Sequence, residues 1–145
     1  MKFLLTTDII INSTPEKIWA VLTDFTNYPN WNPFITSLTG NFEVGKKIMV
    51  RIEPPEAKVN TFKPTVTAYE PKKKLSWLGV FLMRGIFDGE HKFELTDNEN
   101  GTTTLVQSEH FIGILVPLFK KMLDNNTRRG FEAMNKKLKE QVEKQ

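Results

Sequence analysis

The side chains best suited to chemistry are a histidine and a carboxylate on two neighbouring predicted strands. Residues 86–96 and 102–112 read as strands joined by the sequence DNENG, which is typical of a hairpin turn. Alternation places His91 on the apolar face of the first strand, and Gln107 and Glu109 on the apolar face of the second. If both apolar faces point inward, these three polar side chains are close neighbours inside the protein.

Two interpretations of this polar group remain open. A buried carboxylate needs a hydrogen-bonding partner, so His91 and Glu109 can form a self-satisfied structural network. The same side chains can instead anchor a small molecule in an apolar pocket, or act as general acid and base. Either interpretation depends on the strand register, because a shift of one residue turns every side chain to the other face.

The composition excludes several other kinds of site. The chain has no cysteine, which excludes disulfides, thiol catalysis and thiolate metal sites, and its two histidines are too few for a multi-histidine metal centre. We therefore expect neither a metal nor a cofactor. The net charge of +3 is mildly basic. Because the lysines are spread along the chain without a stacking motif, we do not expect nucleic-acid binding.

Length and composition indicate one globular domain over residues 1–145. The chain is 39% hydrophobic and 26% charged, and no apolar run approaches the roughly 20 residues that span a bilayer. We therefore expect no integral membrane association. The first residues, MKFLLTTDIII, differ from a signal peptide because Thr6, Thr7 and Asp8 interrupt the apolar run and no small-residue cleavage site follows. We expect a cytoplasmic protein that is a monomer or a weak dimer.

The elements that must position the polar group are antiparallel strands and one long helix. Residues 2–12 read as a strand, and Thr14 and Pro15 then begin a short helix. Four further strands are expected in FITSL, KKIMVRIE, NTFKPTVTAYE and KLSWLGVF, with Pro64 at an edge or a bulge. The segment NYPNWNPF is expected to form neither helix nor strand, because it contains two prolines. From Val116 to the end, apolar residues recur at helical spacing.

This order of elements predicts an α+β fold. A twisted antiparallel sheet must bury one face, and the C-terminal helix is the only element large enough to cover it. We expect the curved sheet to wrap around this helix, with a hydrophobic cavity where the two do not close tightly.

Two positions interrupt the inward apolar stripe of the long helix. Thr127 lies between Leu123 and Phe131, and Gly130 lies beside it. A glycine within a helix costs about 1 kcal/mol relative to alanine. Gly130 therefore either makes room for a ligand or allows the close approach of a bulky strand residue such as Trp77.

With these elements assembled, the sequence resembles the START-like helix-grip (SRPBCC) superfamily, and within it the polyketide cyclase/dehydrase and lipid-transport branch. The segments that carry the resemblance are STPEKIWAVLTDFTNYPNWNPF, VGKKIMVRIEPP, FKPTVTAYEPKKKLSWLG, GIFDGEHKFEL, GTTTLVQSEHFIGILVPLF and TRRGFEAMN. The matching positions mainly bear the fold: Pro15, Trp19, Asp24, Pro29, Trp31, Pro33, Gly45, Trp77, Gly101 and Thr103. The resemblance implies a pocket that binds lipids, sterols, polyketides or similar apolar molecules. It does not imply catalysis, because the superfamily has no common catalytic motif.

Strand alternation and helical spacing then suggest which residues contact a small hydrophobic ligand. They are Trp31, Phe34, Phe62, Trp77, Phe87, His91, Gln107, Glu109, Phe119, Leu123, Thr127, Gly130 and Phe131. Trp31 and Phe34 either plug the end of the core or form a wall or gate of the cavity. The function expected first is binding or transport of the ligand without catalysis. The alternatives are a cyclase or dehydratase with His91 and Glu109 as acid/base groups, and an interaction module that uses the sheet surface.

Overall fold

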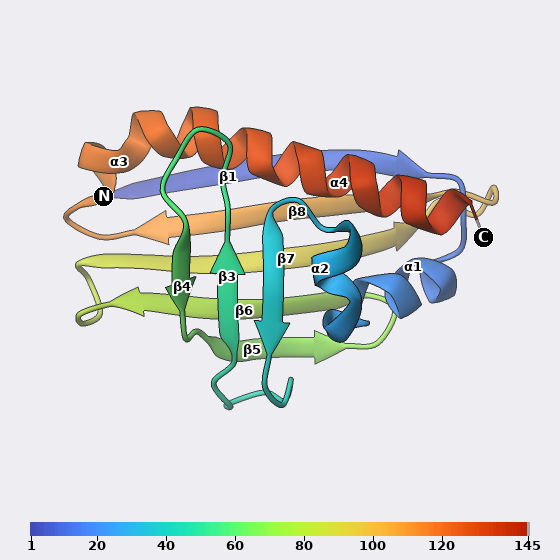
Figure 1. The fold of residues 1–145 in the computed structure, drawn as a ribbon, viewed down its shortest axis with the longest axis horizontal. Helices are drawn as coiled ribbons and strands as arrows, with labels where there is room; N and C mark the ends of the chain where they lie inside the picture. Colours follow the sequence, from blue (N-terminus) through green and yellow to red (C-terminus); the bar gives the residue numbers. More distant parts are fainter. Residues whose placement is uncertain (145) are drawn as a thin grey trace.

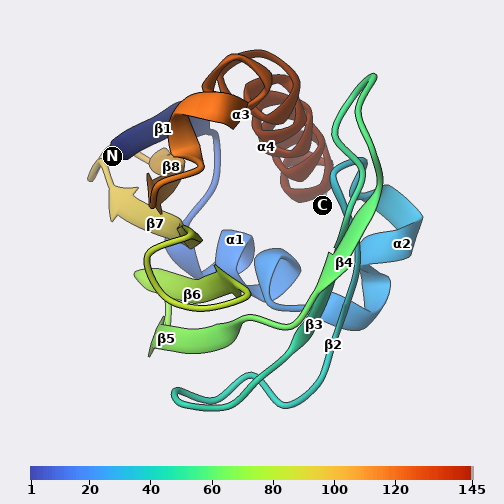
Figure 2. The same ribbon diagram turned by 90° about the vertical axis from the view of Figure 1, so that its left-hand side faces the viewer.

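The protein consists of two antiparallel sheets that curve around a long helix (Figures 1 and 2). The computed structural model describes residues 1–144. The strands are β1 (Lys2–Ile11), β2 (Ile35–Thr39), β3 (Met49–Ile52), β4 (Asn60–Phe62), β5 (Thr65–Glu70), β6 (Lys74–Phe81), β7 (Phe87–Asp97) and β8 (Thr103–Ile112). The helices are α1 (Pro15–Leu22), α2 (Tyr28–Trp31), α3 (Val116–Met122) and α4 (Arg128–Glu143), with a 3-10 turn at Phe25–Asn27 and a π-helical segment at Leu123–Thr127.

The two sheets are joined where the segment just before β3 pairs with the start of β5. The larger sheet has the strand order β1-β8-β7-β6-β5, and the smaller has the order β2-β3-β4. Lys47, just before β3, bridges Thr65 at the start of β5, and the N–H of Ile48 donates to the carbonyl of Pro64 at 3.0 Å. The curved antiparallel sheet predicted from the sequence is therefore present, but it is divided into two hydrogen-bonded parts.

The segment NTFKPTVTAYE forms two strands instead of the single strand predicted. Pro64 separates β4 from β5, and these strands belong to different sheets. A proline has no N–H to donate to a neighbouring strand, so strand pairing is interrupted at this residue. Pro64 thus marks the point where the chain passes from one sheet to the other.

The segment NYPNWNPF contains a turn of helix, so the prediction of an irregular segment was wrong. Pro29 lies in the first turn of α2, where a helix has no need of the missing N–H. The chain then turns at Asn32, whose Oδ1 accepts hydrogen bonds from the backbone N–H groups of Phe34 (3.0 Å) and Ile35 (2.9 Å). This side chain directs the backbone from α2 into β2.

Helix α1 begins where the sequence predicts. The Thr14 side chain accepts a hydrogen bond from the backbone N–H of Lys17 at 3.3 Å, and Pro15 is the first helical residue. The end of α1 is held by Tyr28, whose hydroxyl donates to the carbonyl of Leu22. Complete burial raises the pKa of the Tyr28 phenol far above its ordinary value, and the nearby Asp24 carboxylate raises it further.

The C-terminal helical run covers the concave side of the sheets, as predicted (Figure 1). It extends over 28 residues from Val116 to Glu143, and the π-helical segment interrupts it. It contacts β1, the short helix α1 and β8. Its buried side chains are Val116, Leu123, Thr127, Phe131, Met134, Asn135, Leu138 and Val142. The α+β helix-grip architecture is therefore confirmed.

Candidate functional site

The polar side chains predicted to face inward do so, and they contact one another. His91 on β7 lies directly opposite Glu109 on β8, with Nδ1 at 3.2 Å from the Glu109 Oε1. The other ring nitrogen, Nε2, lies 2.9 Å from the Oε1 of Gln107. The His91 ring packs between Trp77 and Phe131, with centroid distances of 4.9 and 4.7 Å. The predicted register of this hairpin is confirmed.

Two residues that the sequence analysis did not single out extend this contact into a chain of hydrogen bonds. Gln107 Nε2 donates to Asn135 Oδ1 at 2.7 Å, and Asn135 Nδ2 donates to Thr7 Oγ1 at 2.9 Å. The Thr7 hydroxyl in turn donates to the backbone carbonyl of Gln107 at 2.8 Å. Thr7 lies between Leu5 and Ile9 on the inward face of β1, and Asn135 lies on the buried face of α4. Strand alternation could have identified Thr7, and helical spacing could have identified Asn135.

The donor and the acceptor of every bond in this network follow from one contact, the bond between the Thr7 hydroxyl and the Gln107 carbonyl. A carbonyl oxygen only accepts, so the Thr7 hydroxyl must donate there and must accept from the Asn135 amide. The Asn135 oxygen therefore accepts from Gln107, and the Gln107 oxygen is left to face His91. It follows that His91 Nε2 carries a hydrogen. The remaining contact, between Nδ1 and Glu109, requires one proton shared by these two groups.

Glu109 is the residue of this hydrogen-bond network that lies closest to solvent. Its side chain is 16% exposed, whereas that of His91 is 4% exposed. The second carboxylate oxygen, Oε2, lies against the backbone of Gly89 on β7, and a Cβ atom at Gly89 would overlap it. His91 therefore holds one oxygen of the carboxylate, and the other oxygen fits against the backbone because residue 89 has no side chain.

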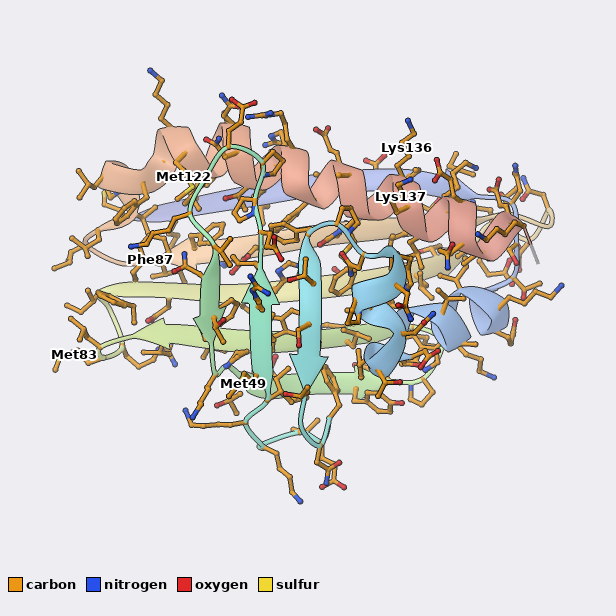
Figure 3. All side chains as sticks on the ribbon, in the orientation of Figure 1. Met49, Met83, Phe87, Met122, Lys136 and Lys137 are labelled. Atoms are coloured by element: carbon orange, nitrogen blue, oxygen red, sulfur yellow. The ribbon has the colours of Figure 1, made fainter. Side chains whose placement is uncertain are left out.

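Aromatic rings lie beside Glu109 at the end of the sheet nearest α3. Phe87 packs edge-on against Phe111 and Phe119, with centroid distances of 5.8 and 5.3 Å. Phe62 on β4 and Phe87 are half-buried against the core, and Phe119 is exposed. Figure 3 shows Phe87 and Met122 at this end of the molecule. The inner face thus remains partly accessible here, next to the carboxylate.

Nearer the middle of the helix, protein side chains fill the positions at which ligand contact was predicted. A Cβ atom at Gly130 would overlap the ring of Phe34, and this ring packs against Phe131 at 5.4 Å. The room beside Gly130 is therefore occupied by Phe34 and not by Trp77. Phe34, Phe131 and Trp77 are all fully buried.

The two predicted positions in the π-helical segment are also covered by protein. Leu123 and Thr127 are buried, and the Thr127 hydroxyl donates to the Met122 sulfur at 3.5 Å. The same segment is attached to the loop between β3 and β4, because Asn126 Nδ2 donates to the Pro55 carbonyl at 2.8 Å. Such π segments are frequent at functional sites, since they re-aim side chains within a helix.

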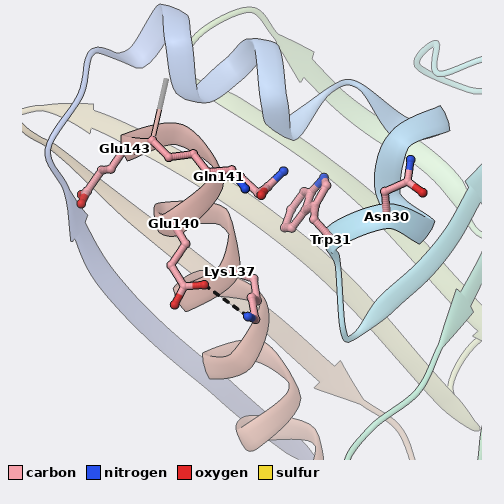
Figure 4. Close-up of a pocket in the computed structure, with 7 residues that line it drawn as sticks. Asn30, Trp31, Lys137, Glu140, Gln141 and Glu143 are labelled. Carbon is pink, nitrogen blue, oxygen red and sulfur yellow. Dashed lines mark ion pairs between the residues drawn. The ribbon is translucent and has the colours of Figure 1, made fainter.

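Trp31 lies at the other end of the helical run, beside a polar groove of about 580 Å³ (Figure 4). The ring is buried and packs edge-on against Tyr28 at 5.3 Å. The groove is lined by Asn30, Trp31, Lys137, Glu140, Gln141, Glu143 and Lys144. An ion pair of 3.3 Å joins Lys137 and Glu140 within it. The structure therefore does not bring Trp31 together with Glu109, and the groove beside Trp31 has a largely charged lining.

Residues 1–144 show no sign of a metal centre or of a membrane-spanning helix. No group of three or more His, Asp or Glu side chains there is arranged to hold a metal ion. Among the helices of this part of the chain, none combines the length and the apolar character needed to cross a membrane.

Comparison with known proteins places the fold in a family. A model of the family described as polyketide cyclase/dehydrase and lipid transport matches residues 2–143. A search of curated proteins finds no match. Among solved structures, the chain is similar to the Zhui aromatase/cyclase from Streptomyces sp. R1128, with a TM-score of 0.78 and 13% identity over 99% of this chain and 95% of that one. It is also similar to a START superfamily protein from Mycobacterium smegmatis, with a TM-score of 0.75 and 17% identity over 97% of each chain.

A third similar structure is the di-domain ARO/CYC BexL from the BE-7585A biosynthetic pathway. The TM-score is 0.78 at 10% identity, and the match covers 98% of this chain but 50% of that one. At these identities the solved structures show a shared fold alone, whereas the family model spans nearly the whole sequence. The chain therefore belongs to the family described as polyketide cyclase/dehydrase and lipid transport.

Proposed function

We propose that the protein binds a small apolar molecule bearing a hydroxyl or amino group, on the inner face of the sheet beside α3. The observation that carries the proposal is the Glu109 carboxylate, which is held by His91, lies over Gly89 and stays partly accessible among aromatic rings. A small-molecule site typically combines an apolar lining with a few fixed polar groups. Glu109 supplies the polar group, and Phe62, Phe87 and Phe119 supply the lining.

The hydrogen-bond chain defines which ligand atom fits. Because Oε1 of Glu109 is engaged with His91, the oxygen over Gly89 is the one free to meet a ligand. A carboxylate oxygen accepts hydrogen bonds, so the matching group is a donor such as a phenol, an alcohol or an amine. A rigid ring system suits the aromatic rings, since these pack edge-on against neighbouring rings.

A pair of probes that differ by one hydroxyl tests this proposal. The expected result is that 1-naphthol binds and raises the melting temperature, while naphthalene binds at least tenfold more weakly because it cannot reach the carboxylate with a donor. Titration calorimetry gives the two dissociation constants. Equal affinity for both probes, or no binding of either, would overturn the assignment.

Two variants locate the site within the fold. Glu109→Gln keeps the shape of the side chain but weakens its acceptor, so it should reduce the preference for 1-naphthol over naphthalene. The matched control is Glu94→Gln, because Glu94 is an exposed carboxylate on the outer face of the same hairpin. The assignment fails if Glu94→Gln has the same effect as Glu109→Gln.

A second candidate function is dehydration of a β-hydroxy ketone by the same residues. The observation that favours it is the 3.2 Å contact of His91 with Glu109, which couples a carboxylate to an imidazole within reach of the accessible face. In this reaction Glu109 removes the proton next to the carbonyl and then delivers that proton to the β-hydroxyl, which leaves as water while the carbon–carbon double bond forms. The relative named an aromatase/cyclase shares this fold at 13% identity.

The two functions are separated by turnover. If the protein is a dehydratase, a β-hydroxy ketone with an aryl substituent is converted to the enone, which is followed by its ultraviolet absorbance. Glu109→Gln should then abolish conversion while Glu94→Gln leaves it unchanged. Binding of 1-naphthol without any conversion of the ketone supports the binding function and removes the dehydratase.

A further inference from the structure

One end of the molecule exposes apolar side chains from three separate segments. Among residues 1–144, the five most exposed large hydrophobic side chains all lie at this end, and Leu82 (83%) and Leu118 (74%) are examples. The set, called the apolar end below, consists of Met1, Phe81, Leu82, Met83, Ile114 and Leu118. Figures 1 and 2 show its segments, namely the start of β1, the β6–β7 loop and the start of α3, gathered on one side of the molecule.

Backbone hydrogen bonds hold the three segments together. The N–H of Gly113 donates to the carbonyl of Met1, and the N–H of Ile114 donates to the carbonyl of Gly85, both at 3.0 Å. Gly113 has a φ of 146°, and a Cβ atom there would overlap the Ile86 carbonyl, so only glycine permits this close approach. The three segments that carry the exposed apolar side chains are therefore held next to one another at this end.

The β6–β7 loop presents its apolar tip in a fixed conformation. Asp88 is buried, and its Oδ2 accepts from Arg84 Nε at 2.9 Å and from the Gly85 N–H at 3.1 Å. Leu82 has a φ of 64°, a conformation that a leucine rarely adopts. The loop thus holds Leu82 in solvent although both its side chain and its backbone would favour another arrangement.

The exposed charges of these three segments all have one sign. Residues 1–2, 81–86 and 113–122 contain four basic side chains and no acidic one; the basic residues are Lys2, Arg84, Lys120 and Lys121. The whole chain has 20 basic and 17 acidic residues, so the remainder has 16 basic against 17 acidic. Arg84 is partly compensated by Asp88, but Lys2, Lys120 and Lys121 are exposed. The positive excess of the protein is therefore concentrated around the apolar end.

We propose that the apolar end docks on the surface of a membrane that contains anionic lipids. Exposed apolar side chains enter the boundary between headgroups and acyl chains, and basic side chains beside them meet the anionic headgroups. Phe119 and Met122, which lie beside the proposed ligand site, continue this surface along α3. The inference goes beyond the proposed ligand binding and does not require it, because the docking surface is present without a ligand.

The charge distribution favours a membrane over a second copy of the chain. Two copies joined through the apolar end would bring their lysines together with no acidic residue of these segments to compensate them. Like charges brought together disfavour association, whereas anionic headgroups neutralise the same lysines. The surface therefore complements an anionic lipid better than it complements itself.

Sedimentation with vesicles tests the proposal on the whole, ligand-free protein. It should bind vesicles of phosphatidylcholine with phosphatidylglycerol, bind pure phosphatidylcholine far more weakly, and lose binding as salt is raised. Lys120→Gln with Lys121→Gln should lower the partition coefficient roughly 25-fold, since each basic residue contributes about fivefold. Leu82→Ser with Leu118→Ser should lower it at least tenfold, and the high exposure of both leucines means that folding is preserved.

Matched variants elsewhere on the surface serve as controls. Lys72→Gln with Lys73→Gln changes two exposed lysines at the opposite end of β6, and Val44→Ser changes an exposed apolar residue outside the apolar end. Both should leave vesicle binding unchanged. The proposal is overturned if the wild type does not bind the anionic vesicles, or if the controls lose as much binding as the test variants.

A second measurement separates the remaining alternatives. Sedimentation velocity without vesicles reports self-association. If Leu82→Ser with Leu118→Ser dissociates a dimer but leaves vesicle binding intact, the apolar end is an interface between two copies and the membrane proposal is wrong. The 1-naphthol titration, repeated on the same variant, reports the ligand site alone, so the failure of one proposal is visible without the other.

Discussion

The substitution Gly130→Ala tests whether the interior beside the long helix is filled. The structure places the Phe34 ring where the alanine Cβ would lie, and Phe34 is buried against Phe131. The ring cannot move aside easily, because it is fully buried and packs edge-on against Phe131. We therefore expect Gly130→Ala to destabilise the protein, although alanine is the better helix former.

The magnitude follows from two opposing effects. Overpacking a filled core costs about 1–3 kcal/mol, while replacing glycine by alanine within a helix contributes about 1 kcal/mol in favour of folding. The net change in the free energy of unfolding is then a loss of about 1 kcal/mol, and up to about 2 kcal/mol if the ring cannot relax. If the Phe34 ring is removed, the overpacking disappears and only the higher helix propensity of alanine remains.

Urea denaturation of a double-mutant cycle measures both effects. Phe34→Val alone lowers stability, by less than the roughly 3–5 kcal/mol expected for truncation to alanine. In that background Gly130→Ala should become stabilising by about 1 kcal/mol, so its effect changes sign. If Gly130→Ala instead stabilises the wild type by this amount, the space beside residue 130 is open. The alternative prediction, that Gly130 makes room for a ligand, would then be supported.

Two further predictions concern titration and proton position. Burial and the Asp24 carboxylate raise the pKa of Tyr28 in the folded protein. Above about pH 10 the phenol ionises in the unfolded chain but stays neutral in the folded protein. The contribution of Tyr28 to stability is therefore present below this pH and is lost progressively above it. Denaturation at increasing alkaline pH should show a fall of up to about 1.4 kcal/mol per pH unit that Tyr28→Phe reduces; exposed Tyr69 gives the control, and an equal effect of Tyr69→Phe would contradict the assignment. For His91, nitrogen-15 NMR of labelled protein should find Nε2 protonated at neutral pH, as the hydrogen bonds from Thr7 through Asn135 and Gln107 require. An unprotonated Nε2 would contradict the donor and acceptor roles assigned to Thr7, Asn135 and Gln107.

The sequence was a good guide where the pattern is local. The turn sequence DNENG fixes the pairing of β7 with β8, and alternation then determines that His91 and Glu109 face the interior together. Thr14 and Pro15 mark the start of α1 by the same kind of local chemistry. These predictions need no knowledge of distant parts of the chain.

The features that the sequence did not reveal depend on residues far apart in the chain. That Phe34, and not Trp77, fills the room beside Gly130 depends on how the start of β2 packs against α4. The role of Pro64 depends on which strands pair with β4 and β5, since a proline at an edge and a proline between two sheets look alike in sequence. The basic apolar end is likewise spread over three segments that only the fold brings together.

The proposed ligand site and the apolar end meet at Phe119, which packs on Phe87 and continues the apolar end along α3. A ligand bound beside Phe87 and Phe119 would then face the lipid rather than water whenever the protein is docked. Transfer between the membrane and the protein would expose little apolar surface to water, where each 100 Å² costs roughly 2.5 kcal/mol. Anionic vesicles should therefore accelerate the uptake of a sparingly soluble ligand in proportion to docking, and Lys120→Gln with Lys121→Gln should slow that uptake without changing the final affinity. An unchanged uptake rate in that variant would mean that the two surfaces act independently.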